Sequence, residues 1–97
     1  MPTYIVLGNY TEQGIRNIKQ VANLRQAAEQ WAASHGGRVV GNYMTLGSYD
    51  FVFVVELPSP EVALEGALLF GSQGEVRTQT LMAFPTEAAE AIAQSLP

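Results

Sequence analysis

The residues best suited to acid–base chemistry are Tyr49 and Asp50, which follow Gly47-Ser48 in the middle of the chain. A carboxylate shielded from water has a raised pKa and can act as a general base, and a neighbouring phenol can donate a proton. In a structural interpretation, Gly47 makes a tight turn and Asp50 accepts hydrogen bonds from nearby backbone. The residue types leave both interpretations open, and we expect Asp50 to be mainly structural and ionised at neutral pH.

Chemistry at Tyr49 and Asp50 would need further polar groups in an apolar pocket, and Tyr43 and Arg77 are the candidates for these. The expected ligand-binding set is Tyr43, Tyr49, Asp50 and Arg77, in which Asp50 and Tyr49 are the candidates for catalysis.

Several other chemistries lack the residues that they require. The chain has no cysteine, which excludes disulfides, thiolate metal sites and thiol nucleophiles. His35 is the single histidine and the nine acidic residues show no ligand spacing, so we expect no metal site and no cofactor. Gly71-Ser72-Gln73-Gly74 leads from a helix into a strand, which is the reverse of a phosphate-binding loop.

Charge and hydropathy limit the partners that the chain could have. The net charge is −4 and no basic run exists, so we expect neither nucleic acid nor an anionic membrane as a partner. We see no signal peptide and no apolar stretch of the ~18 residues that span a membrane, and with the absence of cysteine this predicts a cytoplasmic location. Only 14% of the residues are charged, against the usual ~25%, which predicts that a partner covers part of the surface.

The order of the predicted elements is β-α-β-β-α-β followed by a C-terminal helix. This order is that of the ferredoxin-like α+β fold, with an antiparallel sheet in the order 4-1-3-2 and the two main helices on one face. Residues 1–97 are expected to form a single domain. The predicted strands are 4–7, 38–46, 51–57 and 75–84, and the predicted helices are 12–19, 24–35 (with Asn23 as its cap), 60–70 and one that begins at 85–86.

Side-chain alternation assigns the faces of the strands if Gly47-Ser48 forms a two-residue hairpin turn, with Leu46 opposite Tyr49. Val40 would then face the helices and Val39 would face away from them. The predicted core residues are Phe51, Phe53, Val55, Trp31, Leu24 and Ile5.

The face opposite the helices is expected to be apolar and uncovered. Val52 and Val54 point to it, and Tyr4, Val6 and Tyr43 are predicted to join them. An antiparallel strand with one wet face should alternate between apolar and polar residues, whereas residues 51–55 are apolar throughout. We therefore expect a homo-oligomer, in the simplest case a dimer, that associates through this outer sheet face.

The chain resembles the GYD-domain family, named for a Gly-x-Tyr-Asp signature that Gly47, Tyr49 and Asp50 match. The resemblance continues through residues 4–9, 11–19 and 71–84. It implies a ferredoxin-like domain similar to the dimeric α/β-barrel proteins, and it implies no particular activity. That wider group includes cofactor-independent monooxygenases, lactone isomerases and ligand-sensing modules, so the fold leaves the function open.

Two functions are compatible with these observations. The favoured one is a homo-oligomeric small-molecule-binding or accessory domain, because no recognisable catalytic set is present. The alternative is a cofactor-independent enzyme, of the isomerase or monooxygenase type, acting on a small apolar substrate. The enzyme requires Asp50 to face an enclosed cavity, whereas a structural Asp50 has its oxygens satisfied by local backbone.

Overall fold

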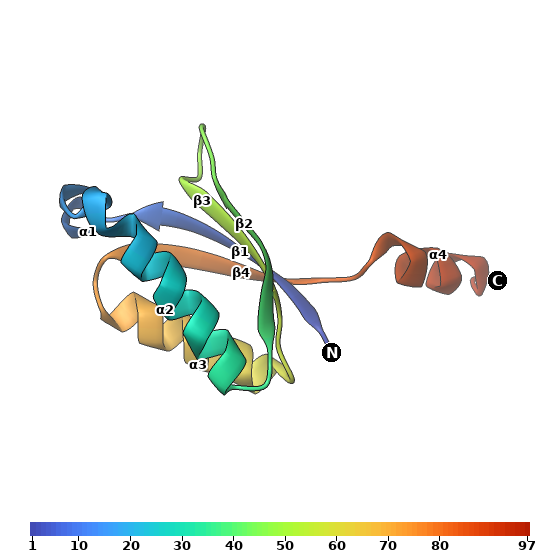
Figure 1. The fold of residues 1–97 in the computed structure, drawn as a ribbon. Coiled ribbons are helices and arrows are strands. Elements are labelled where there is room, and N and C mark those ends of the chain that lie inside the picture. The colour runs from blue at the N-terminus through green and yellow to red at the C-terminus, as the bar shows by residue number, and fades with distance from the viewer.

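The computed structural model describes all 97 residues and shows a four-stranded antiparallel sheet with α2 and α3 on one face (Figure 1). The strands are β1 (Thr3–Tyr10), β2 (Arg38–Met44), β3 (Phe51–Glu56) and β4 (Val76–Ala83). The helices are α1 (Glu12–Arg16), the 3₁₀ helix η1 (Ile18–Gln20), α2 (Val21–Ser34), α3 (Pro60–Ser72) and α4 (Thr86–Gln94).

The strand order is β2-β3-β1-β4, which is the predicted order 4-1-3-2 counted from the other edge. The first strand therefore lies in the centre, where it pairs antiparallel with β3 on one side and with β4 on the other. This arrangement confirms the ferredoxin-like α+β fold, with two helices on one face and an additional C-terminal helix.

The helices begin close to the predicted positions, with one correction. Ser59 caps α3 through its side chain, which accepts a hydrogen bond from the Val62 N–H, and Pro60 occupies the first turn as predicted. Asn23 does not cap α2, because that helix begins at Val21 and the Asn23 amide donates to the Gln20 side chain instead. The η1 turn carries the chain directly into α2, so the helix needs no side-chain cap there.

The first strand presents the opposite faces from those predicted. Tyr4 pairs with Val55 and Val6 with Phe53, so Tyr4 and Val6 face the helices rather than the outer face. Ile5, predicted in the core, points outward. Residues 4–7 are all apolar, so side-chain alternation favoured neither face, and pairing with β3 decided it.

The hairpin between β2 and β3 has the predicted register but a longer loop. Met44 pairs with Phe51, as expected if Leu46 lies opposite Tyr49, yet the strands end there and residues 45–50 form the loop. The register shifts between Val39 and Gly41. This bulge turns Val39 toward the helices and leaves Val40 exposed, which reverses the predicted faces of both residues.

The core lies between the sheet and the two helices. Its buried cluster is small, and Trp31 and Val6 pack around it while only partly buried. Phe51 and Val55 are buried as predicted, whereas Phe53 on β3 and Leu24 on α2 lie between the sheet and the helices without being fully covered. The cluster consists of Tyr4, Ala32, Val55, Leu57 and Ala63.

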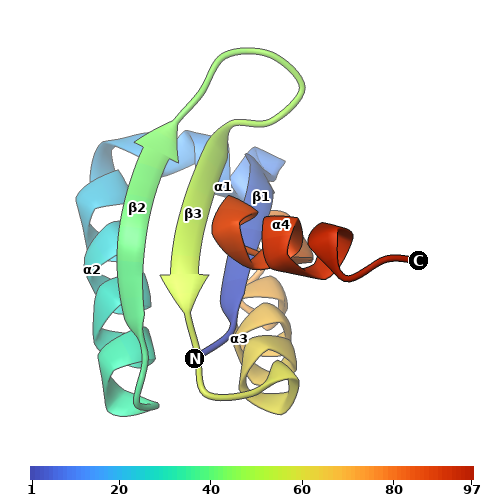
Figure 2. The same cartoon turned by 90° about the vertical axis from the view of Figure 1, so that its right-hand side faces the viewer.

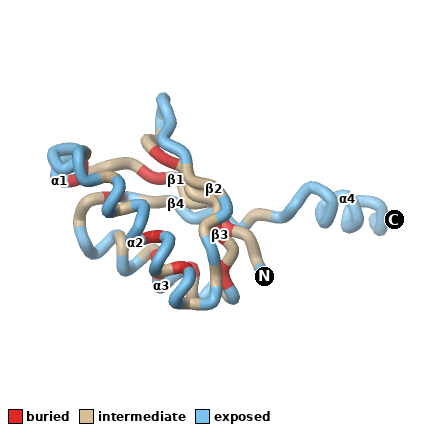
Figure 3. The backbone as a smooth tube through the Cα atoms, viewed as in Figure 1, coloured by how far each residue is buried: buried red, intermediate tan, exposed pale blue.

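The C-terminal helix α4 projects from the sheet on the side opposite α2 and α3 (Figures 1 and 2). All of its residues are exposed, as the pale blue tube in Figure 3 shows. We call this projecting helix the α4 arm. With the arm included, the chain measures 53 × 31 × 18 Å. No helix in the chain combines the length and the apolar character that crossing a membrane requires.

Candidate functional site

Asp50 fastens the β2–β3 loop to the end of β1. Its N–H donates to the Gly8 carbonyl at 2.8 Å, and its own carbonyl accepts from the Thr45 N–H at 2.8 Å. The carboxylate Oδ2 accepts from the Tyr10 N–H at 2.9 Å. These bonds hold the loop against β1, and the backbone N–H that bonds one carboxylate oxygen belongs to a strand forty residues away rather than to local backbone as expected.

Tyr49 reaches across the sheet from the same loop. Its hydroxyl lies 3.0 Å from Oε1 of Gln79 on β4, to which it donates a hydrogen bond. Gln79 pairs with Leu7, which in turn pairs with Val52, so this contact lies on the outer sheet face. Gly47 in the loop has φ +108°, a conformation that glycine adopts without strain. The Gly-x-Tyr-Asp residues thus join the loop to both β1 and β4.

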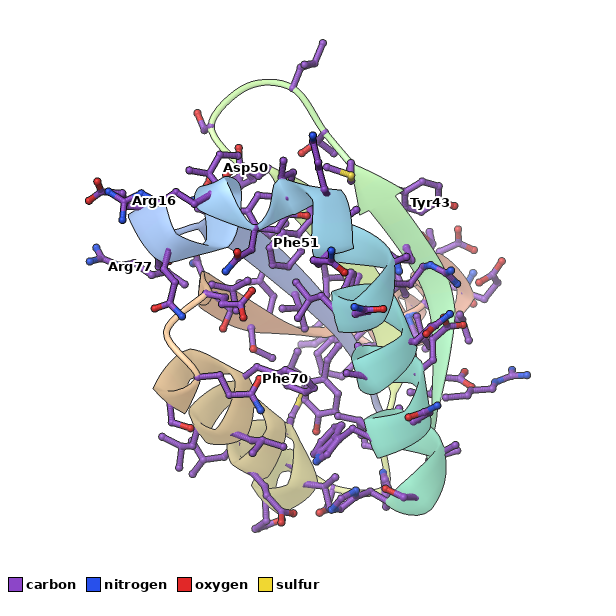
Figure 4. All side chains as sticks on the ribbon, turned by 60° about the vertical axis from the view of Figure 1, so that its left-hand side comes forward. Arg16, Tyr43, Asp50, Phe51, Phe70 and Arg77 are labelled. Atoms are coloured by element: carbon purple, nitrogen blue, oxygen red, sulfur yellow. The ribbon has the colours of Figure 1, made fainter.

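The four candidate residues lie around one end of the outer face rather than in a common pocket. Tyr43 is 62% exposed on β2, at one edge of the sheet. Arg77 lies on β4 at the other edge, where it pairs with Asn9 and makes no ion pair. Figure 4 shows Tyr43 and Arg77 extending to opposite sides of the domain. The arrangement brings Tyr49 and Asp50 into one loop but leaves the other two apart, and their joint role stays a prediction.

Tyr10 is the group whose ionisation the fold perturbs. Burial raises the pKa of its phenol above the usual 10.0, and the nearby negative charge of Asp50 raises it further. The Tyr10 ring lies 5.2 Å from that of Phe51, under the first turns of α2. Nothing in the sequence indicated this residue, because a lone tyrosine at a strand end has no distinctive pattern.

We expect replacement of Asp50 by asparagine to lower the pKa of Tyr10 in part, since burial, the larger cause, remains. Because folding raises this pKa, Tyr10 contributes stability that is present below its unfolded pKa and is lost as the pH rises through the folded pKa. Carbon NMR of ring-labelled tyrosine, assigned with Tyr10→Phe, measures the titration. Glu61→Gln, on α3, serves as the control, and equal shifts in both variants would contradict an effect of the Asp50 charge.

An apolar cavity of about 80 Å³ lies between the inner face of the sheet and the two helices. Of its 18 lining residues, 15 are hydrophobic and none is charged, which separates it chemically from the four candidate residues. The sequence did not predict this cavity. The signal for it was a set of small residues on the sheet-facing sides of α2 and α3, namely Ala28, Ala32, Ala63, Gly66 and Ala67.

A second cavity, of about 250 Å³, lies between α2 and the paired strands β2 and β3. Arg25 and Asn42 are its polar members, and Tyr10 closes one side. None of the four candidate residues lines either cavity. No group of three or more histidine and acidic side chains is placed where it could hold a metal ion.

The outer sheet face is apolar through its centre. Charges lie near its ends, where Arg38 pairs with Glu56 at 2.7 Å and Arg77 extends from β4. Figure 2 views this side of the sheet. The α4 helix projects from it, and no other helix lies over the apolar centre. The residues of this apolar centre are Ile5, Leu7, Tyr43, Val52, Val54 and Leu81.

Three comparisons relate the chain to known proteins. The family model of the GYD domain matches residues 4–93. A protein of Thermus thermophilus named "Glutamine synthetase and cystathionine beta-lyase binding protein" is 37% identical over 86 residues, which are 88% of this chain and 90% of that protein.

The third comparison concerns the fold. The crystal structure of FFRP-DM1 matches with a TM-score of 0.58 at 21% identity, covering 87% of this chain and all of that one. The likeness supports the ferredoxin-like topology and carries no further information about function. The sequence matches do carry family membership, and on their strength this chain belongs to the GYD-domain family.

Proposed function

We propose that this protein is an accessory protein that associates with itself through the outer sheet face and binds other proteins. The observation that carries the proposal is the apolar centre of that face. Monomeric soluble proteins rarely expose a contiguous apolar patch of more than a few hundred Å², and larger patches mark interaction sites. Tyr4 and Val6 face the helices, but Ile5 and Leu7 take the places predicted for them on the outer face, so its centre is still apolar.

The small core of the single chain also favours association. Eleven of the 97 residues are buried, and no large side chain is completely enclosed. A chain of this length buries only about 60–65% of the surface that its unfolded form exposes, so an isolated copy is modestly stable. Burying about 800 Å² on each copy would form an interface of ordinary size.

The α4 arm supplies a second surface for the same assembly. Ile92 in α4 is 59% exposed, and Leu96, which follows the end of the helix, is 68% exposed. The arm leaves the sheet on the outer side, where a second copy would lie (Figure 2). Exposed apolar side chains on this arm are well suited to pack against that copy.

The name of the Thermus thermophilus relative supports binding to other proteins, since that protein is named for binding glutamine synthetase and cystathionine beta-lyase. Catalysis is less well supported. The Asp50 carboxylate lines neither cavity, whereas a general base must lie within hydrogen-bond reach of its substrate.

Replacing Val54 by lysine should convert the oligomer into monomer, because a charge in the apolar centre would have to be desolvated at the interface. Leu81→Lys should do the same, and as Leu81 is 40% exposed on an edge strand, this variant leaves the fold of the chain less disturbed. Light scattering coupled to gel filtration measures the mass, with circular dichroism to verify folding.

The matched control is Gln30→Lys, which adds the same charge on the exposed side of α2 and should leave the mass unchanged. Wild-type monomer at micromolar concentration would refute association through this face. Ile92→Lys tests the arm separately, and we expect it to weaken the oligomer without abolishing it.

Binding to other proteins is tested with glutamine synthetase and cystathionine β-lyase purified from the same organism as this chain. Surface plasmon resonance with each enzyme should give saturable binding, and bovine serum albumin serves as the negative control. If both enzymes fail to bind while the oligomer is intact, the role in partner binding is refuted and self-association stands.

A further inference from the structure

The larger cavity, between α2 and the strands β2 and β3, is lined along the sheet by three aromatic rings. The rings of Tyr10 and Phe53 each lie 5.2 Å from that of Phe51, at interplanar angles of 45° and 44°. Figure 4 labels Phe51 near the first turns of α2. We call these three rings the aromatic wall. Aromatic rings pair favourably with one another in tilted and offset arrangements, so this wall is suited to an aromatic ligand.

Two polar side chains line the same cavity. Asn42 lies on the inner face of β2, where it pairs with Phe53, and its side-chain amide makes no hydrogen bond within the chain. Arg25 lines the cavity from α2 and is the single charged residue of the lining. Because this residue is a cation and no acidic residue lines the cavity, the lining favours an anion over a cation.

The Arg25 guanidinium keeps donors available for a ligand. Its Nη1 donates to Oε1 of Glu29 at 2.9 Å, and both side chains are 49% exposed. A guanidinium has five N–H donors in a planar fork, which matches the two oxygens of a carboxylate. Exposed ion pairs of this kind contribute little free energy, so a ligand carboxylate can share Arg25 with Glu29 or replace it.

We propose that this cavity binds a small aromatic monocarboxylate, with its ring against the aromatic wall and its carboxylate at Arg25 and Asn42. An apolar cavity of ~150 Å³ accommodates benzene, so about 250 Å³ has room for a ring that carries a short acid side chain. Asp50 accepts the Tyr10 N–H at 2.9 Å, and its negative charge would repel a carboxylate at that end of the wall. The site lies on the helix side of the sheet, so its test is independent of association through the outer face.

Met44 supplies a signal for binding. It lines the cavity, whereas Met1 and Met82, the other two methionines of the chain, do not. An aromatic ligand should therefore shift the carbon-13-labelled methyl signal of Met44, assigned with Met44→Leu, and leave the other two signals in place. Shifts of all three signals together would indicate non-specific binding and overturn the proposal.

Three probes with the same ring and a similar length test the chemistry: phenylacetate, the uncharged phenylacetamide and the 2-phenylethylammonium ion. We expect saturable binding of phenylacetate, about tenfold weaker binding of phenylacetamide, which corresponds to ~1.4 kcal/mol, and none of the ammonium ion. Failure of phenylacetate to saturate the Met44 signal in the millimolar range would overturn the site. Equal affinities for the acid and the amide would overturn the preference for an anion.

Replacing Arg25 by glutamine should weaken phenylacetate about tenfold and leave phenylacetamide unchanged. Arg38→Gln is the matched control, because it removes the same charge at a residue outside the cavity and should change neither affinity. Equal losses of phenylacetate affinity in both variants would reduce the effect to net charge and contradict the role of Arg25.

Glu29→Gln should tighten phenylacetate about threefold, because Glu29 competes for the guanidinium, and should not affect phenylacetamide. Combined with Arg25→Gln, it should leave phenylacetate weak. Recovery of the wild-type affinity in the double variant would show that Arg25 only masks the charge of Glu29, and its direct contact with the ligand would be disproved.

A last pair of variants locates the site. Ala22 lines the cavity from an exposed position of α2, so Ala22→Phe should fill the space and abolish binding of both phenylacetate and phenylacetamide. Ala33→Phe, at an exposed position of α2 outside the cavity, should change neither affinity. Circular dichroism verifies that both variants are folded, and unchanged binding in a folded Ala22→Phe would place the ligand elsewhere and overturn the proposal.

Discussion

Truncating Phe51 to alanine should lower the free energy of unfolding by about 3–5 kcal/mol. The side chain is 3% exposed, and its ring lies 5.2 Å from the rings of both Tyr10 and Phe53. It also covers Gly8 so closely that any Cβ at that position would lie 1.9 Å from the ring. Because Phe51 lines both cavities, its removal would join them into one larger void that the surrounding side chains cannot close.

Urea denaturation followed by circular dichroism measures this loss. Small domains unfold at a cost of about 5–15 kcal/mol, so the variant would lose a large share of its stability. Phe84→Ala is the matched control, since Phe84 is 64% exposed and its truncation should change stability by less than about 0.5 kcal/mol. A loss below about 1 kcal/mol for Phe51→Ala would mean that its ring does not close the core.

A methyl group at Gly14 should be strongly destabilising. Gly14 is buried in α1, and a Cβ there would lie 2.0 Å from the backbone carbonyl oxygen of Glu75. That carbonyl cannot move freely, because it accepts a hydrogen bond from the Thr11 N–H at 3.0 Å. We expect Gly14→Ala to cost about 2–4 kcal/mol by forcing α1 away from the start of β4.

Gly71→Ala makes the same chemical change where space is available. Gly71 lies in α3 without a positive φ, and a methyl group added there would have nothing within 4 Å. Alanine is favoured over glycine in a helix, so this variant should be more stable by about 0.4–1 kcal/mol. Opposite signs of the two changes in urea denaturation would support the close contact at Gly14, and equal effects would contradict it.

The GYD resemblance has a physical explanation at these positions. Thr11 bonds the 74–75 backbone with both its N–H and its hydroxyl, and Gly14 allows the close approach that these bonds need. Asp50 in turn holds the β2–β3 loop on β1. These residues therefore join elements that are distant in sequence.

The order of elements could be predicted from the sequence, because each element carries its own local signal. Ser59 and Pro60 mark the start of a helix, and glycines and polar turns separate runs of β-branched residues. The topology then follows, since a β-α-β-β-α-β chain has few ways to place its helices on one face of an antiparallel sheet. The predicted pairing next to the hairpin loop was also correct, as the Met44–Phe51 pair shows, although the loop is longer than the predicted two-residue turn.

The candidate site could be located in the sequence only in part. Tyr49 and Asp50 were identified by type, but their partners Gln79 and Tyr10 are thirty and forty residues away, and no local pattern connects them.

What the sequence determined by itself was therefore the set of elements, their order and the excluded thiol chemistry, all of which depend on residues that are near neighbours or on composition. Only the tertiary structure decided which side of β1 faces the helices. Both sides of residues 4–7 are apolar, so their burial is equally favourable either way, and the choice is made by hydrogen bonding to β3 and β4. The bulge at Val40 and the cavity above Tyr4 depend in the same manner on long-range packing.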